Sequence, residues 1–234
     1  MSEIIDEGTI KGAVDFVKIK GMETILMQMK KSICKIDGKL IGTGFFCRIN
    51  DIPCLLTNYH LLDKEYIKMH SKIGISMNDK KINEDIIINE EDIIYQSIRN
   101  EYDLIIIKLK EEYMKNINYL ELDDNLFNKN SLKGYESNSI YILHYPNSQD
   151  VPVSYGNGIT FDEENKYDMK YKCNTLSGSS GGPILNLLTN KMIGIYKGCI
   201  QKNDGIKYNI GTFLKYPLKE INNNKIKRRK RIYE

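Results

Sequence analysis

The sequence predicts an all-β protein of two lobes, on three observations. Short runs rich in β-branched and aromatic residues recur with Gly, Asn or Asp turn signals every ten or so residues, which is typical of a β-sandwich or barrel. These runs stop in a polar, turn-rich stretch between about Lys110 and Ser137 and then resume. The 234 residues are enough for two lobes that each bury a core.

The strand-like runs divide the chain into segments. We expect a first β-barrel over residues 32–120, an inter-barrel connection over 121–137 and a second β-barrel over 138–215. The first set of runs is SICKI, KLIGTGFFCRI, IPCLLTNY, KIGISM, DIIIN, DIIYQSI and DLIIIKL. The second set is SIYILHY, VPVSYGNGITF, YDMKYKCNT, GPILNL, KMIGIYKG and KYNIGTFLKY.

Helices are expected only at the two ends. In the N-terminal extension, residues 1–31, and just beyond it, an apolar stripe with helical spacing is formed by Met22, Ile25, Leu26, Met29 and Ile33. We expect this amphipathic helix to pack on the barrels, and a regulatory lid is the alternative. Over residues 216–234, Pro217 suits the first position of a short C-terminal helix, which ends in a basic tail.

The composition narrows the compartment and the partners. The net charge of +3 names no partner, and the chain has neither a run of about 18 apolar residues nor an apolar leader segment. We therefore expect no membrane contact and a cytoplasmic location. Five cysteines at irregular spacings, without a C-x-x-C pair, indicate reduced thiols rather than a zinc site or a disulfide framework. The tail KIKRRKR at 225–231 is the one candidate for nucleic-acid contact or nuclear targeting, against a solvated tail.

The stretch TLSGSSGGPILN contains the candidate nucleophile. Glycines around a serine let backbone N–H groups converge on a developing oxyanion. The pattern G-x-S-G-G places the reactive hydroxyl on Ser180 and the oxyanion donors on the N–H groups of Gly178 and Ser180. Taken alone, the pattern is more typical of a surface loop than of a catalytic turn, so a catalytic reading needs a base and an orienting group.

Two further residues are candidates for that base and that orienting group. Among the three histidines, His60 ends the strand-like run LLTNYH, His70 lies in a charged stretch, and His144 lies inside YILHYP. Asp103 leads into the apolar strand DLIIIKL, where a carboxylate is costly unless it is paired. Orienting His60 would supply that partner, and a strand-start turn residue is the alternative. The chain order is His60, Asp103, Ser180.

The segments around these residues resemble those of a known family. The segments GTGFFCRI, LLTNYH, YDLIIIKL, SGSSGGPILN and MIGIYKG resemble those of the trypsin-like, chymotrypsin-fold serine proteases, in which the same chain order occurs. The resemblance implies two Greek-key β-barrels with the active site in the cleft between them. It implies that Ser180 attacks the carbonyl, that His60 is the base and that Asp103 fixes its tautomer. It also implies a protein or peptide substrate and no metal or organic cofactor.

The chain departs from the secreted branch of that family. Ser179 stands where secreted trypsins have the aspartate that pairs with a new N-terminus, no IVGG-type start is present, and no cysteine closely follows His60. The sequence is nearer to HtrA-like, glutamyl-endopeptidase-like, intracellular and viral relatives. Ser179 also motivates the alternative of a latent or inactive protease fold that only binds peptides, and an esterase remains chemically open.

The resemblance also implies a substrate pocket. Its residues are Asn174, Thr175, Tyr196, Lys197 and Gly198. Asn174 stands where trypsin has its specificity aspartate, which argues against cleavage after Lys or Arg. Lys197 could attract an acidic side chain, and the alternative is a solvated surface charge.

Overall fold

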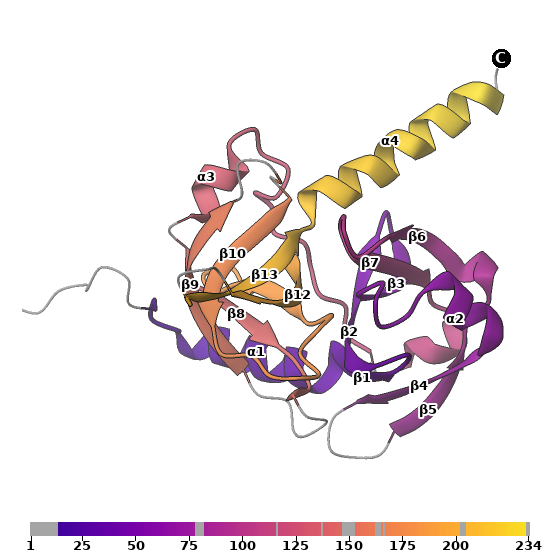
Figure 1. Ribbon diagram of the computed structural model, residues 1–234, viewed down its shortest axis with the longest axis horizontal. Coiled ribbons are helices and arrows are strands. Elements are labelled where there is room, and N and C mark those ends of the chain that lie inside the picture. Colours follow the sequence, from indigo (N-terminus) through magenta and orange to yellow (C-terminus); the bar gives the residue numbers. More distant parts are fainter. Residues whose placement is uncertain are drawn as a thin grey trace, which may run out of the picture.

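The computed structural model describes residues 14–77, 82–115, 117–136, 138–146, 153–161, 165, 167–201 and 205–232. It consists of two barrel-like β-sheets that lie side by side, with helices at the periphery (Figure 1). This arrangement confirms the predicted all-β architecture of two lobes.

The first lobe is a seven-stranded antiparallel sheet in the order β5-β4-β1-β2-β3-β7-β6. Short helical segments α2 (Lys64–Met69), η1 (Glu90–Asp92) and η2 (Glu111–Met114) connect or flank its strands. The strands are β1 (Ile33–Asp37), β2 (Ile41–Ile49), β3 (Ile52–Thr57), β4 (Lys72–Met77), β5 (Ile82–Ile87), β6 (Ile93–Ser97) and β7 (Leu104–Lys108).

The second lobe closes on itself. Its strands form a barrel in the order β10-β13-β12-β11-β8-β9, so that no strand of this lobe lies at an end of the sheet. The helix α3 (Ser131–Tyr135) precedes the barrel. The strands are β8 (Ile140–Leu143), β9 (Val153–Phe161), β10 (Asp168–Cys173), β11 (Pro183–Asn186), β12 (Met192–Gln201) and β13 (Lys207–Phe213).

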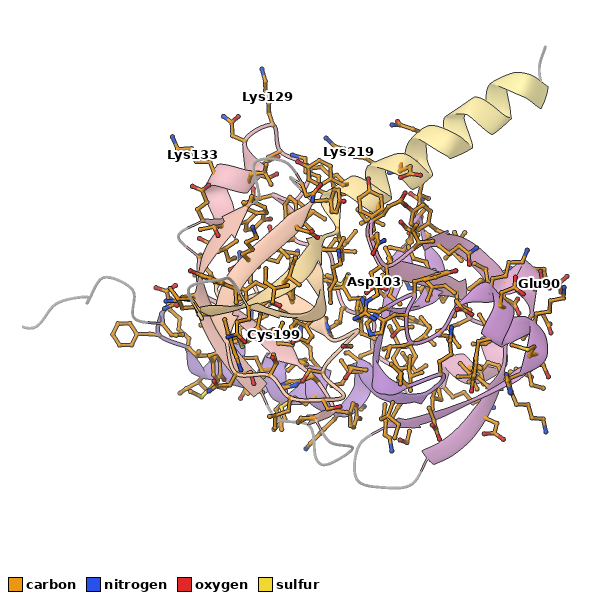
Figure 2. The ribbon with its side chains drawn as sticks, in the orientation of Figure 1. Glu90, Asp103, Lys129, Lys133, Cys199 and Lys219 are labelled. Carbon is orange, nitrogen blue, oxygen red and sulfur yellow. The ribbon has the colours of Figure 1, made fainter. Side chains whose placement is uncertain are left out.

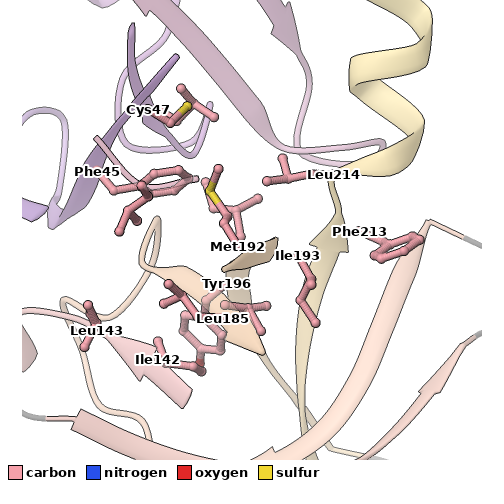
Figure 3. Packing of buried hydrophobic residues seen from close by; sticks show 14 of the residues in the cluster. Phe45, Cys47, Ile142, Leu143, Leu185, Met192, Ile193, Tyr196, Phe213 and Leu214 are labelled. Carbon is pink, nitrogen blue, oxygen red and sulfur yellow. The ribbon is translucent and has the colours of Figure 1, made fainter. Parts of the chain in front are cut away.

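The two lobes share a continuous hydrophobic core. Adjacent residues of the first sheet alternate between two clusters: Phe45 packs toward the second lobe, and Phe46 packs into the interior of its own lobe. Such alternation follows from the period of two in a strand. Figure 3 shows Phe45 and Cys47 beside Met192 and Leu214 of the second lobe. Each fully buried apolar side chain contributes roughly 1.5–3 kcal/mol relative to exposure, so this contact holds the lobes together.

The N-terminal helix α1 (Ile19–Lys31) packs on the second lobe, although the chain next enters the first. Gln28 donates to the Asn190 carbonyl at 2.9 Å and accepts from the buried Tyr141 hydroxyl at 2.7 Å. Within the predicted apolar stripe, Ile25 is buried, whereas Met22 and Leu26 are about half exposed. Ile25 and Met29 of the stripe pack against the core, whereas the hydrogen bonds of the helix to the second lobe come from Gln28, a polar residue that the stripe did not include.

The C-terminal helix α4 (Lys215–Ile232) projects from the body of the molecule (Figure 1). It begins two residues before Pro217, which lies in the first turn, where its missing N–H costs no hydrogen bond. The backbone of the basic tail 225–231 continues this helix, while its side chains lie outside the described residues. None of the helices in the described part of the chain combines the length and apolarity that crossing a bilayer requires.

Candidate active site

His60 and Asp103 meet at the edge of the first lobe. Asp103 Oδ2 lies 2.7 Å from His60 Nδ1, and Asp103 Oδ1 accepts the His60 backbone N–H at 3.0 Å. The carboxylate side chain is 1% exposed and the imidazole is 10% exposed. Figure 2 shows Asp103 at the boundary between the lobes. Two contacts from one carboxylate fix both the position and the ring orientation of the histidine.

The backbone around Asp103 is itself held in place. Asp103 has a φ of +48°, a left-handed conformation that Asp tolerates better than most residues. The Asn58 amide donates to the Asp103 carbonyl at 2.9 Å, and the Asp103 N–H donates to the Ile98 carbonyl at 3.0 Å. From the second lobe, Thr212 Oγ1 donates to the Tyr102 carbonyl at 2.7 Å. The position of the carboxylate thus depends on both lobes.

Ser180 lies on the turn between β10 and β11 in the second lobe. Its Oγ is 3.4 Å from the Lys197 carbonyl oxygen, a long and weak hydrogen bond. Both Ser180 and His60 are described, and no hydrogen bond joins them in this part of the chain. The structure brings His60 and Asp103 together and places Ser180 on the facing lobe.

The turn before Ser180 has a defined type. The Ser179 N–H donates to the Leu176 carbonyl at 3.1 Å, and Gly178, the third residue of that turn, has a φ of +91°. A positive φ at this position characterises a type II turn, which favours glycine there. Within the described residues, the N–H groups of Gly178 and Ser180 have no hydrogen-bond acceptor. Two unpaired donors two residues apart can bind an anionic oxygen.

Thr43 of β2 connects this turn to the first lobe. Its N–H donates to the Ser180 carbonyl at 2.8 Å, and its Oγ1 donates to the Gly178 carbonyl at 2.8 Å. Gly181, with a φ of +85°, packs against the same strand, and a Cβ there would overlap the Thr43 carbonyl oxygen. Thr43 was not among the predicted site residues, because threonine in a strand is unremarkable in sequence.

The comparisons with known proteins give the family. The family model described as "Trypsin-like peptidase domain" matches residues 42–195, which include His60, Asp103 and Ser180. The chain belongs to this family. Searching curated protein sequences gives no match for this trypsin-like peptidase.

Three solved structures illustrate the fold of this trypsin-like peptidase. The HtrA-type protease AlgW with a tripeptide is 15% identical, with a TM-score of 0.58, and the match covers 84% of this chain but only 61% of that one. The protease domain of the Sesbania mosaic virus polyprotein is 18% identical (TM-score 0.56, 80% of this chain and 90% of that one). Tobacco etch virus protease with product is 14% identical (TM-score 0.52, 80% and 75%). At these identities the likeness shows the fold.

The predicted pocket residues of the trypsin-like peptidase fall into two groups. Asn174 and Thr175 line a cavity of about 540 Å³ together with Cys173, Cys199 and Asn209. Figure 2 marks Cys199 on the second lobe. The Thr175 hydroxyl lies 2.9 Å from the Tyr196 hydroxyl and donates to Asn209 Oδ1 at 3.0 Å. No carboxylate is among the described residues that line this cavity, so it offers no counter-charge to a Lys or Arg side chain. Its full set of lining residues is Tyr155, Tyr171, Lys172, Cys173, Asn174, Thr175, Cys199, Lys207, Tyr208 and Asn209.

The other three predicted pocket residues, Tyr196, Lys197 and Gly198, are not among the residues that line this cavity. The Lys197 ammonium forms an ion pair with Asp168 at 3.0 Å and donates to the Glu101 carbonyl at 2.8 Å. Its side chain is 11% exposed, which rules out the solvated surface charge that was the alternative in sequence. The side chain ties the residues before Asp103 to the second lobe, and the Lys197 carbonyl faces Ser180.

Behind the nucleophile turn, Ser179 contacts a buried histidine that the sequence analysis left without a role. The Ser179 hydroxyl lies 2.6 Å from His144 Nδ1, and His144 Nε2 lies 2.9 Å from the Ser154 hydroxyl. Ser179 is fully buried and His144 is 2% exposed. Burial lowers the pKa of His144 from 6.5 to about 4, because an imidazolium ion is poorly solvated there.

This buried histidine should give the protein an acid-sensitive stability. Because the pKa of His144 is lowered to about 4 in the folded state, its stabilising contribution is complete above the unfolded pKa of 6.5 and is lost as pH falls from there toward 4. We expect the stability advantage of the wild type over His144→Asn to narrow by about 2 kcal/mol between pH 7 and pH 5. Urea unfolding at each pH measures it. Ser154→Ala, which keeps the imidazole, should retain the wild-type pH slope, and an advantage that does not change with pH would contradict the assignment.

Proposed function

We propose that this trypsin-like peptidase is an active serine endopeptidase that uses His60, Asp103 and Ser180, with the N–H groups of Gly178 and Ser180 as its oxyanion hole. The observation that carries the proposal is the pairing of a buried carboxylate with His60 on one lobe, opposite a serine that directly follows a type II turn, together with two unpaired N–H donors. Each feature alone has a structural explanation, but acyl transfer requires them together.

The proposed reaction uses each group in turn. Ser180 Oγ attacks the carbonyl carbon of the peptide, and its proton passes to His60 Nε2. Asp103 holds the proton on Nδ1 and stabilises the imidazolium ion. The negative oxygen of the tetrahedral intermediate accepts hydrogen bonds from the N–H groups of Gly178 and Ser180. His60 then protonates the leaving amine, and a water molecule, activated by His60, hydrolyses the acyl-enzyme.

Strand β12 supports the proposal of an extended peptide substrate. It pairs with β11 only as far as Ile195, whereas its pairing with β13 continues to Gln201. Within the described residues, one edge of β12 beyond Lys197 therefore has no partner strand. An extended peptide can add to such an edge through main-chain hydrogen bonds. This edge begins at Lys197, whose carbonyl faces Ser180, so a bound peptide would pass the proposed nucleophile.

One observation is also expected for a second candidate function, a latent or inactive peptide-binding module. Ser180 Oγ contacts the Lys197 carbonyl and makes no hydrogen bond to His60 among the described residues. Catalytic hydrogen bonds are often long before substrate binds, so this geometry is consistent with either function. The two candidates differ in whether Ser180 reacts.

A fluorophosphonate probe tests the proposal, since it phosphonylates activated serines. We expect the wild type to be labelled, Ser180→Ala to lose labelling completely, and Ser179→Ala, the matched serine one residue away, to keep a measurable level. Mass spectrometry of the labelled peptide identifies the modified residue. Labelling that survives Ser180→Ala but not Ser179→Ala would overturn the assignment, and a wild type that never reacts would favour the binding module.

We also propose a reducing compartment, the cytoplasm, for this reaction. All five cysteines lie in the described part of the chain, and each is a free thiol. Disulfides form and persist in oxidising compartments. Cys34, Cys47 and Cys54 are buried, so they pack as small apolar side chains.

A further inference from the structure

The nucleophile turn is connected to a buried polar chain that no step of the proposed reaction uses. Ser179 makes hydrogen bonds through every polar group it has. Its N–H donates to the Leu176 carbonyl, its carbonyl accepts the Gly182 N–H at 3.0 Å, and its Oγ accepts the Leu176 N–H at 3.1 Å. The remaining capacity of Oγ is directed at His144.

The donor-to-acceptor direction of this series of hydrogen bonds follows from the donors available. Because Ser179 Oγ already accepts from Leu176, its O–H can point to His144 Nδ1, which leaves the ring proton on Nε2 for the Ser154 hydroxyl. Ser154 in turn hydrogen-bonds Cys173, whose pKa burial raises to about 11. No charged group among the described residues contributes to the lowered pKa of His144. The chain therefore consists of neutral groups with one consistent direction.

A second contact connects the same stretch of chain to the turn. The N–H of Tyr145, next to His144, donates to Thr43 Oγ1 at 3.0 Å, and that hydroxyl donates to the Gly178 carbonyl. Residues 144–145 thus reach the Gly178 carbonyl through Thr43 and contact the Ser179 side chain directly. The next residue after Ser180, Gly181, leaves no space for adjustment against β2.

We propose that His144 is a positioning residue for the nucleophile turn: as a neutral hydrogen-bond acceptor for Ser179, it holds the N–H groups of Gly178 and Ser180 in the conformation that binds an oxyanion. This inference rests on the proposed function. His144 itself touches no reacting atom and acts through Ser179. In a chain that has no aspartate at position 179, an uncharged hydrogen bond orders the turn.

The test compares Ser179→Ala, His144→Leu, the double variant and His144→Asn, whose side-chain oxygen can replace Nδ1 as the acceptor. We expect Ser179→Ala and His144→Leu each to lower the fluorophosphonate labelling rate and the kcat for a peptide substrate by about 100-fold, with KM nearly unchanged. The labelling rate and kcat of the double variant should be no lower than those of the less active single variant, because the two groups form one contact. His144→Asn should recover at least about tenfold over His144→Leu.

Amide exchange of Leu176 and Ser179 provides a readout that needs no activity, because both N–H groups are bonded within the turn. We expect both to exchange faster in Ser179→Ala and His144→Leu than in the wild type. A wild type that does not react with the probe would contradict the proposed function alone. In that case the exchange measurement tests the positioning role, which is overturned if Leu176 and Ser179 exchange in the variants at the same rates as in the wild type. A reactive wild type whose folded variants react equally fast, lose KM instead of kcat, or show additive losses would overturn it while the proposed function stands. If His144→Leu fails to fold, Ser179→Ala and His144→Asn decide in the same way.

Discussion

Asp103→Asn should lower kcat by about 10⁴-fold at neutral pH while the protein remains folded. Asp103 accepts from both the His60 N–H and the Nδ1 proton. An asparagine can keep the first contact only by turning its NH₂ group toward Nδ1. The imidazole must then carry its proton on Nε2, the nitrogen that has to accept the proton of Ser180. The measurement is the steady-state kcat on a peptide substrate.

Asp123→Asn is the matched control for this prediction. Asp123 is also buried, at 2% exposed, and accepts from the hydroxyls of Tyr135 and Thr189. These partners lie away from the proposed nucleophile, so the substitution should reduce stability and leave kcat of the folded protein near the wild-type value. If Asp103→Asn reduced kcat less than about tenfold, or no more than Asp123→Asn, His60 would not depend on Asp103 for its tautomer.

Gly181→Ala should destabilise the protein by about 4 kcal/mol or more. The residue has a φ of +85°, and its added Cβ would overlap the Thr43 carbonyl and lie 2.5 Å from Thr57 Oγ1. Both neighbours belong to strands of the first lobe, whose backbone cannot yield without breaking the sheet. Urea unfolding followed by far-UV circular dichroism gives the free energy of unfolding.

Gly158→Ala separates the two contributions to that loss. Gly158 also has a positive φ, of +67°, but open space surrounds its missing side chain. We expect a cost of roughly 1–2 kcal/mol there, from the left-handed conformation alone. Equal losses in the two variants would mean that the close contact with Thr43 does not constrain the turn.

The fold could be predicted from the sequence because strand patterns are local. Runs such as FFCRI and LLTNY are short, apolar and β-branched, and turn residues separate them. Closure of the second sheet, in contrast to the open first sheet, depends on the pairing of β10 with β13. Such long-range pairing leaves no mark in a single sequence. The apolar stripe predicted that α1 packs on the barrels, and Ile25 does so. The hydrogen bonds that join α1 to the second lobe could not be predicted, because they come from Gln28, a polar residue without a pattern.

The residues of the candidate site also divide into those that local sequence reveals and those that depend on distant contacts. His60, Asp103 and Ser180 could be proposed because each lies in a recognisable local segment. Thr43 and His144 could not, since each acquires its partners only when distant strands meet. Lys197 shows the limit most clearly: the sequence allowed a charge open to substrate or a solvated surface charge, whereas in the structure the ammonium group forms an ion pair with Asp168.

The position of α1 has a consequence for the order in which the molecule assembles. Its contacts through Gln28 join residues that are 113 and 162 positions apart in the chain. Contacts of such high sequence separation form late, because the intervening chain must be ordered first. During synthesis, α1 leaves the ribosome long before the strands that receive it. Docking of this helix therefore requires the second lobe, and a nascent or truncated chain that lacks this lobe carries α1 without its hydrogen-bond partners.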